Sequence, residues 1–198
     1  MRRTFSLRDP GIRNILFKYG LDDAKPIGRG MFSAVYDCGD RVMKVTSDLA
    51  YVNFLDYCKG DFFPALYGRH REDSARLPID VLEIEKLTPL HRAGAPVAKQ
   101  GRRLVRAFNR AAFEEWRGRD WQRRRLAAMV EHAESTGDDD YVNAILDVEH
   151  FATNWIGALE LDVHGANLMA RGDHLVLTDM FADTQYLKAQ GRIFVFCV

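Results

Sequence analysis

Three polar side chains late in the chain have the types and spacing that phosphoryl transfer requires. Asp162 and Asn167 lie five residues apart in LDVHGANL, and Asp179 follows in LTDMF. Phosphoryl transfer needs a carboxylate that orients the attacking hydroxyl and accepts its proton, and oxygen ligands for the Mg²⁺ that bridges the phosphates. Asp162 suits the first role, and Asn167 with Asp179 suits the second. Either acid alone is more typical of a turn or a loop.

A glycine-containing segment and a lysine near the start of the chain have the types that bind nucleotide phosphates. IGRGMFSAVY contains Gly28, Gly30 and the small Ser33, and glycines let backbone N–H groups approach a phosphate closely. Lys44 follows Gly30 by fourteen residues, on a strand expected to pair back beneath this loop. The segment lacks the Gly-Lys-Ser/Thr of a P-loop and the strand-to-helix turn of a dinucleotide site. Taken separately, such glycines indicate a tight turn and such a lysine a surface side chain.

Hydrophobic periodicity predicts the elements that would position these residues. Polar and apolar residues alternate on both sides of Cys38-Gly39-Asp40, which predicts a β-hairpin or short meander. Two more segments have the composition of strands, 62–72 and 77–87. Helical spacing of apolar residues predicts helices over 9–20, 49–59, 99–117, 119–134 and 141–159. The predicted order is a β-rich region, a linker in HRAGAP and a helical region.

Residues at the ends of these segments indicate where helices and hairpins begin and end. Asp9 would cap the first helix, with Pro10 at its first position, and Gly20 would end it. Ser47 or Asp48 would cap the second helix, and the aspartates of 138–140 would cap the last one. A hairpin with its turn at Arg171-Gly172-Asp173 follows Asn167.

Composition indicates a soluble, intracellular protein. The 198 residues are 47% hydrophobic and 28% charged, with a formal net charge of zero. No segment approaches the ~20 apolar residues of a membrane helix, and the basic N-terminus lacks the apolar run of a secretory signal. Three cysteines (Cys38, Cys58 and Cys197) are too few and scattered for a disulfide framework and fit a reducing cytosol. We therefore expect a cytoplasmic protein with no membrane partner.

The charges are segregated along the chain. Segment 99–125 has ten Lys/Arg against three acids, and segment 131–160 has eight acids and no Lys or Arg. The basic segment would bind an acidic protein or nucleic acid, or it would form a solvated helix face; both readings stay open. Gly118 marks a predicted break within this segment. Trp116 and Trp121 would stack on bases or cover a core, and core packing is the favoured alternative.

Taken together, four motifs resemble the protein-kinase-like fold. They are Gly28-x-Gly30-x-x-Ser33-x-Val35, Val42-Met43-Lys44, Asp162-x-x-x-x-Asn167 and Asp179-Met180-Phe181, in the family's order. The Asp-x-His-x-x-Asn form of the third motif is similar to that of aminoglycoside and choline kinases. Over roughly 25–90 and 140–188, the chain most resembles the catalytic domain of the early serine/threonine protein kinases of lytic podoviral bacteriophages.

The resemblance implies an α+β, bilobal fold and a set of roles. A small β-rich N-lobe would cover 1–90, with a hinge at about 84–90, and a reduced, mainly helical C-lobe would cover 91–198. ATP and Mg²⁺ would be the cofactors, and the acceptors would be host proteins of transcription or RNA processing in the bacterial cytoplasm. Asp162 and Lys44 would be catalytic, and Asn167 and Asp179 would hold the metal. The nucleotide would contact Gly28, Gly30, Ser33, Val35 and Lys44, with the backbone of Glu85 and Leu87 at the adenine.

Several departures from the family leave other functions open. The helix over 49–59 offers Asp48 and Asp56 where the family has a glutamate that pairs with the strand lysine. Glu160 and Leu161, not His-Arg, precede Asp162, and the chain ends nineteen residues after Asp179. We therefore expect the usual substrate-binding helices to be absent or replaced. The alternative is a catalytically degenerate kinase-like scaffold that binds a host protein or nucleic acid through its Arg-rich helices; a small-molecule kinase ranks third.

Overall fold

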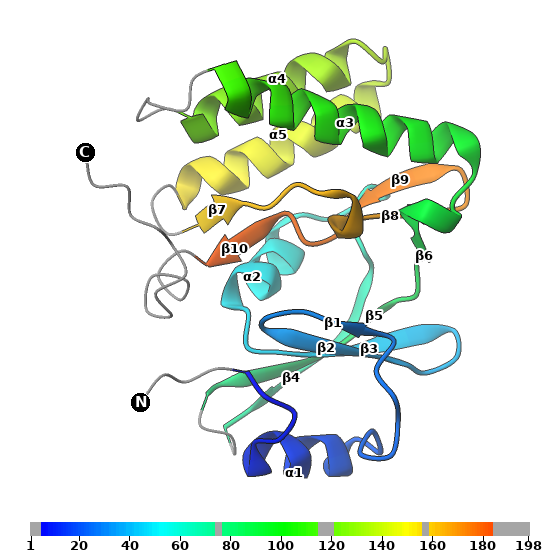
Figure 1. Cartoon of the computed structure of the whole chain (residues 1–198), viewed down its shortest axis with the longest axis vertical. Coiled ribbons are helices and arrows are strands. Elements are labelled where there is room, and N and C mark those ends of the chain that lie inside the picture. The colour runs from blue at the N-terminus through cyan, green and yellow to red at the C-terminus, as the bar shows by residue number, and fades with distance from the viewer. Residues whose placement is uncertain (1–4, 74–76, 115–120, 156–158, 184–198) are drawn as a thin grey trace. The chain divides into compact units, whose positions relative to one another are not determined.

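The computed structural model of the chain describes residues 5–73, 77–114, 121–155 and 159–183 (Figure 1). Within these residues the protein is mixed α+β, with five α-helices. It divides into two compact units. Unit 1 contains residues 5–52 and 65–86 of the described chain, and unit 2 contains 53–64 and 87–183.

Unit 1 is built on an antiparallel sheet whose five described strands run in the order β1-β2-β3-β5-β4. The predicted hairpin at Cys38-Gly39-Asp40 is confirmed, since the Cys38 N–H donates to the Arg41 carbonyl at 3.0 Å. Gly39 has a φ of +88°, a backbone conformation that favours glycine. The strands are β1 Gly28–Arg29, β2 Ser33–Asp37, β3 Arg41–Thr46, β4 Leu66–Glu72 and β5 Ile79–Glu85.

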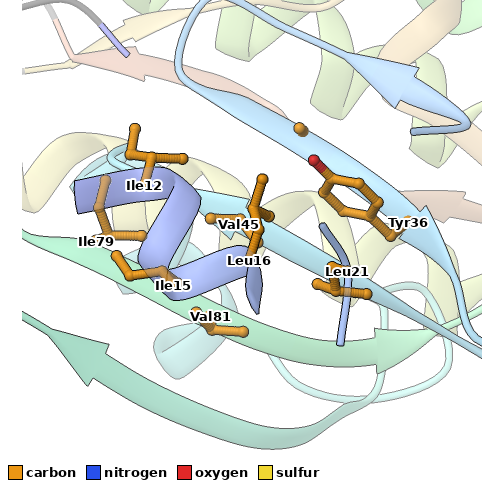
Figure 2. Packing of buried hydrophobic residues seen from close by; sticks show 9 residues of the cluster. Ile12, Ile15, Leu16, Leu21, Tyr36, Val45, Ile79 and Val81 are labelled. Atoms are coloured by element: carbon orange, nitrogen blue, oxygen red, sulfur yellow. The ribbon is translucent and has the colours of Figure 1, made fainter. Parts of the chain in front are cut away.

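Helix α1 (Pro10–Lys18) covers one face of this sheet and confirms the predicted first helix. Asp9 caps it by accepting a hydrogen bond from the Gly11 N–H at 2.8 Å. Its apolar stripe packs against side chains that alternate along β2, β3 and β5 (Figure 2). The buried members of this cluster are Ile12, Ile15, Leu16, Leu21, Ala34, Tyr36, Val45, Ile79 and Val81.

The opposite face of the sheet carries polar groups. Side chains alternate between faces along a strand, so Lys44 and Thr46 point away from the face that holds Val45. In the β3–β5 register Lys44 is opposite Leu82 and Thr46 is opposite Asp80, which puts those partners on the same face. The α1 side of the sheet is therefore an apolar core, and the other side carries charge.

Helix α2 (Leu49–Tyr57) follows β3, and the division between the units falls within it. Of the two predicted caps, Asp48 is the one observed: its Oδ1 accepts from the Tyr51 N–H at 3.2 Å. Leu49, the first residue of the helix, is apolar but 46% exposed.

In unit 2, α3 (Ala95–Glu114), α4 (Trp121–Glu134) and α5 (Asp139–Asn154) lie side by side (Figure 1). Helix α3 begins at Ala95, inside the predicted linker HRAGAP, because Pro96 is tolerated in the first helical turn. Asp138 caps α5 as predicted, accepting from the Tyr141 N–H at 3.0 Å. The predicted end of this helix is wrong: α5 stops at Asn154, and Leu159 begins a strand.

Short strands complete unit 2. β8 (Leu168–Arg171) pairs with β9 (His174–Leu177) and with β6 (Thr88–Pro89), and β7 (Leu159–Leu161) pairs with β10 (Phe181–Asp183). The predicted turn at Arg171-Gly172-Asp173 joins β8 to β9, with Gly172 at a φ of +57°. Single 3₁₀ turns lie at Leu90–Arg92 (η1) and Gly165–Asn167 (η2).

Three sequence expectations fall on residues outside the described ranges: Trp116, the break at Gly118 and Cys197. Within the described ranges, no helix is both long enough and apolar enough to cross a membrane.

Candidate functional site

The glycine-containing segment of unit 1 forms a tight connection between β1 and β2. The Gly30 N–H donates to the Ser33 carbonyl at 2.9 Å, and Gly28 is opposite Val35 in the strand register. Neither glycine has a positive φ, so the backbone conformation alone does not require them. A Cβ on Gly30 would lie 3.3 Å from the Ser33 Oγ, so local crowding favours glycine there.

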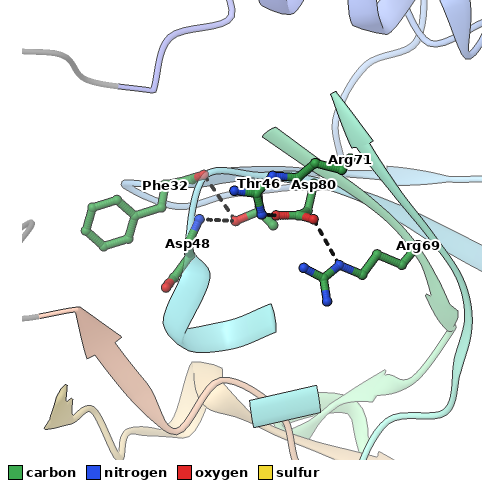
Figure 3. Close-up of polar contacts among 6 residues, drawn as sticks. All are labelled: Phe32, Thr46, Asp48, Arg69, Arg71 and Asp80. Carbon is green, nitrogen blue, oxygen red and sulfur yellow. Dashed lines mark hydrogen bonds and ion pairs between the residues drawn. The ribbon is translucent and has the colours of Figure 1, made fainter. Parts of the chain in front are cut away.

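The tip of this connection is tied to the end of β3. The carbonyl of Phe32 accepts from the Ser47 N–H at 2.9 Å and from the Thr46 hydroxyl at 3.3 Å (Figure 3). The Thr46 hydroxyl in turn accepts from the Asp48 N–H at 3.0 Å. These bonds fix the loop between Gly30 and Ser33 to the strand that carries Lys44.

Lys44 is a buried lysine, only 6% exposed, so the alternative of a surface side chain is wrong. Its Nζ lies over the ring of Tyr51 in the first half of α2, 3.2 Å from the ring centroid. A cation over an aromatic face is attracted by the ring quadrupole, and the attraction strengthens away from water. The sequence analysis missed Tyr51, because the contact joins a strand to the helix that follows it.

The two acids weighed as partners of Lys44 have different environments. Asp48 is 6% exposed and caps α2 within unit 1. Asp56 is exposed near the end of α2. The buried acid is therefore the capping aspartate that precedes α2, and the acid within the helix is exposed.

A second buried charge, which the sequence analysis also missed, lies on the same sheet face as Lys44. The carboxylate of Asp80 is within 3.0 Å of Arg69 Nε and 2.8 Å of Arg71 Nη1 (Figure 3). Asp80 is 3% exposed, and a carboxylate at that depth is stable only when paired and hydrogen-bonded. The three residues come from the adjacent strands β4 and β5, where Arg71 is directly opposite Asp80.

The residues predicted at the adenine lie at the end of β5. The Glu85 N–H donates to the Ala65 carbonyl at 3.0 Å, and the Glu85 carboxylate accepts from the Ala65 N–H at 3.2 Å. Glu85 belongs to unit 1 and Leu87 to unit 2. The side chains of Glu85 and Leu87 are half-buried.

In unit 2, hydrogen bonds gather the predicted catalytic and metal-binding residues around the β8–β9 hairpin. Asn167 Nδ2 donates to the Asp162 carbonyl at 2.7 Å and lies 3.3 Å from Asp162 Oδ2. The Thr178 N–H and hydroxyl both donate to the Asn167 carbonyl, at 3.0 and 2.9 Å. The Asp162 N–H donates to the Met180 carbonyl at 2.9 Å. Asp179 lies between Thr178 and Met180, so Asp162, Asn167 and Asp179 belong to one bonded loop cluster.

An aromatic cluster anchors the chain just after Asp179. The Phe181 ring lies 5.5 Å from that of Phe54 and 5.0 Å from that of Phe151, centroid to centroid. Met180 is fully buried. Such aromatic pairs contribute roughly 0.5–1.5 kcal/mol each beyond the burial of their area, which stabilises the chain segment that follows Asp179.

His164 has contacts within the same loop. Its Nδ1 accepts from the Ala166 N–H at 3.2 Å, which caps η2, and its Nε2 lies 3.5 Å from Asp162 Oδ2. The side chains of both His164 and Asp162 are half exposed. These contacts are those of a hydrogen-bonded structural histidine.

Glu160 lies just before the Asp162 loop, and its carboxyl interacts with the charge of Arg125 in α4. Burial raises the pKa of the Glu160 carboxyl, Asp162 adds to the rise, and Arg125 opposes it. The Arg125 guanidinium stacks on Phe108 and Trp121, at 4.4 and 4.5 Å from their ring centroids. Trp121 is half-buried and contacts Arg125 of its own helix.

The loop cluster has oxygen ligands of the kind that Mg²⁺ prefers. Asn167 and Asp179 would supply an amide and a carboxylate oxygen, and Mg²⁺ usually fills the rest of its octahedral shell with water and phosphate oxygens. Across the described part of the chain, no group of three or more His, Cys, Asp or Glu is arranged to hold a metal ion. An amide and a carboxylate oxygen are donors that suit Mg²⁺ better than a transition metal.

A cavity of about 330 Å³ lies elsewhere in unit 2, and none of the predicted site residues lines it. Its lining includes four aspartates beside Lys59 and His174: Asp61, Asp138, Asp140 and Asp147. An excess of negative charge would repel the phosphates of a nucleotide. This cavity is therefore unsuited to ATP.

Comparison with protein-family models found no match, and comparison with curated proteins found no match either.

Proposed function

We propose that this chain is an ATP- and Mg²⁺-dependent phosphotransferase with a bilobal, protein-kinase-like fold. In this proposal Lys44 and the loop over residues 28–33 hold the ATP phosphates, and the backbone of Glu85 and Leu87 meets the adenine. Asp162 orients the acceptor hydroxyl and takes its proton, and Asn167 with Asp179 holds Mg²⁺. The bound metal would neutralise the charge that develops on the transferred phosphoryl group.

The observation that carries the proposal is the hydrogen-bonded cluster around the β8–β9 hairpin. A carboxylate for proton transfer and two metal ligands must be fixed with respect to one another before the substrate binds. The bonds from Asn167 to Asp162, from Thr178 to Asn167 and from Asp162 to Met180 supply that fixation. Lys44 is a second support, because it lies on the strand whose end is hydrogen-bonded to the loop over residues 28–33.

The acceptor class is proposed from the resemblance to phage serine/threonine protein kinases. We infer that the hydroxyl acceptors are serine or threonine side chains of bacterial host proteins that carry out transcription or RNA processing. The reaction would then occur in the host cytoplasm.

The test is transfer of label from [γ-³²P]ATP in the presence of Mg²⁺, with and without bacterial lysate. We expect labelled proteins with the wild-type chain and at least a hundredfold lower rate with Asp162→Ala, since a positioned base contributes roughly 10²–10⁴ in rate. Asp173→Ala is the matched control, because Asp173 is an exposed aspartate in the turn of the same hairpin. Equal labelling by the Asp162 and Asp173 variants would refute the assignment of Asp162.

A second candidate is a kinase-like scaffold that has lost transfer and binds a host protein or nucleic acid. The absence of a glutamate in α2, where Asp48 and Asp56 are the acids, favours it. Mg²⁺-dependent ATP binding by wild type, lost in Lys44→Met but without labelled protein in any sample, would select this candidate over the first.

A further inference from the structure

Helix α3 presents a continuous row of positive charge. Its basic residues recur every three or four positions, which places them on one face of the helix. All of them are exposed: Lys99, Arg102, Arg103, Arg106 and Arg110. The opposite face is buried through residues such as Leu104 and Phe108. We call the five residues the α3 cationic face.

Nothing in the described part of the chain neutralises this face. No Asp or Glu occurs in the sequence between residues 95 and 113. Among the described residues, none of the five forms an ion pair. Like charges three or four positions apart each destabilise a helix by roughly 0.2–0.5 kcal/mol. A sequence that keeps such a row breaks a local rule of helix design, which is typical of a functional surface.

The composition of the face favours nucleic acid over an acidic protein. The centres of protein–protein interfaces combine Arg with exposed aromatic residues and Met, and are otherwise depleted in charged residues. Within the described chain, the large apolar side chains that are exposed all lie outside α3 and α4. Nucleic-acid backbones, by contrast, are bound through Arg and Lys contacts to phosphates. The acidic cavity of unit 2 shows that positive charge does not cover this unit uniformly.

We propose that the α3 cationic face binds the sugar–phosphate backbone of nucleic acid without reading base sequence. Residues 99–110 span roughly 16 Å of helix at about 1.5 Å per residue. Duplex DNA carries one charge per ~1.7 Å of its axis, so this length can meet several phosphates. None of the five residues takes part in the proposed phosphoryl transfer, and the proposal does not depend on that activity.

The test measures the affinity of the full chain for a fluorescent 20-base-pair duplex of random sequence by anisotropy, as a function of KCl. If the five cations each neutralise one phosphate, log K should fall with log [KCl] at a slope of about −4.5. Binding should then be roughly 500-fold weaker at 200 mM than at 50 mM salt. The triple variant Arg103→Gln/Arg106→Gln/Arg110→Gln should bring the slope to about −1.8.

A charge-matched triple variant of unit 1, Arg8→Gln/Arg13→Gln/Lys25→Gln, should keep the wild-type slope. Thermal unfolding by circular dichroism should show the α3 variant at least as stable as wild type, because like-charge repulsion has been removed. An equal slope for wild type and the α3 variant, or an equal change in both triple variants, would overturn the proposal. Tighter binding of poly-glutamate than of the duplex at the same salt would also overturn it, and would indicate an acidic protein as the partner.

Discussion

Buried polar groups are treated differently in the two units. In unit 1 the buried charges lie against partners: Lys44 lies over Tyr51, and Asp80 binds two arginines. In unit 2, three buried side-chain atoms have no hydrogen-bond partner among the described residues: Arg125 Nε, His132 Nε2 and Tyr141 Oη. All three belong to α4 and α5.

The two units therefore differ in how their buried polar groups contribute to stability. A buried group that is fully paired adds rigidity and specifies one arrangement, whereas an unpaired one only loses its hydration. The paired charges on the sheet face of unit 1 therefore stabilise its structure. The unpaired polar atoms between the helices of unit 2 destabilise that unit, and apolar packing offsets the loss. In unit 2 the well-satisfied polar network is the Asp162–Asn167–Thr178 loop. Removing a buried polar group should therefore lower the free energy of unfolding in unit 1 and raise it between the helices of unit 2.

The largest effect on stability is expected from Asp80→Asn. Removing one partner of a buried ion pair leaves uncompensated charge, which costs about 3–5 kcal/mol in a fully buried site. The side chains of Arg69 and Arg71 are 33% and 42% exposed, so we expect a loss near the lower limit, about 3 kcal/mol. Denaturant unfolding would measure it, with the exposed Asp73→Asn as the matched control. A loss of unfolding free energy in Asp80→Asn no greater than in Asp73→Asn would show that the ion pairs of Asp80 do not stabilise the fold.

The same substitution, Tyr to Phe, should have opposite effects in the two units. The Tyr19 hydroxyl donates to Glu72 Oε1 at 2.8 Å, and burial together with this bond raises the pKa of Tyr19 to about 12. Tyr19→Phe should therefore destabilise the protein by about 1 kcal/mol. Tyr141→Phe should stabilise it by about 1 kcal/mol, because it removes a buried hydroxyl that has no partner. Chemical denaturation of both variants gives the two signs, and a loss of stability in Tyr141→Phe would contradict the comparison.

Short sequence patterns were sufficient to predict structure where the conformation of a segment depends on its own residues. Asp9, Pro10 and Gly20 marked the ends of α1, and Gly39 and Gly172 marked two hairpin turns, because each acts through its own backbone or the next turn. The clustering of Asn167 and Asp179 could also be expected, since one hairpin joins them. These features do not depend on distant residues.

Contacts between distant segments could not be predicted in the same way. Arg69 and Arg71 reach Asp80 only because β4 pairs with β5 in a particular register, and a shift of one residue would put Asp80 on the other face. The burial of Lys44 beneath Tyr51 depends on how α2 leaves β3. The end of α5 was overestimated because Trp155 and Leu159 continue the apolar spacing after the helix has stopped.

The smallest expected effect is on the pH dependence of stability. It tests the burial of His132 in unit 2, whose Nε2 has no hydrogen-bond partner among the described residues. Burial lowers the pKa of His132, and the nearby charge of Arg103 lowers it further. A histidine whose folded pKa lies below its unfolded value of about 6.5 is protonated first in the unfolded chain, so stability is kept above pH 6.5 and lost as pH falls below it. His132→Gln should therefore reduce the drop in unfolding free energy between pH 7.5 and pH 5, whereas His150→Gln, at an exposed histidine of α5, should not. Arg103→Gln should raise the His132 pKa, as measured by NMR titration. An unchanged pKa in that variant would show that the α3 cationic face does not act on the interior of unit 2.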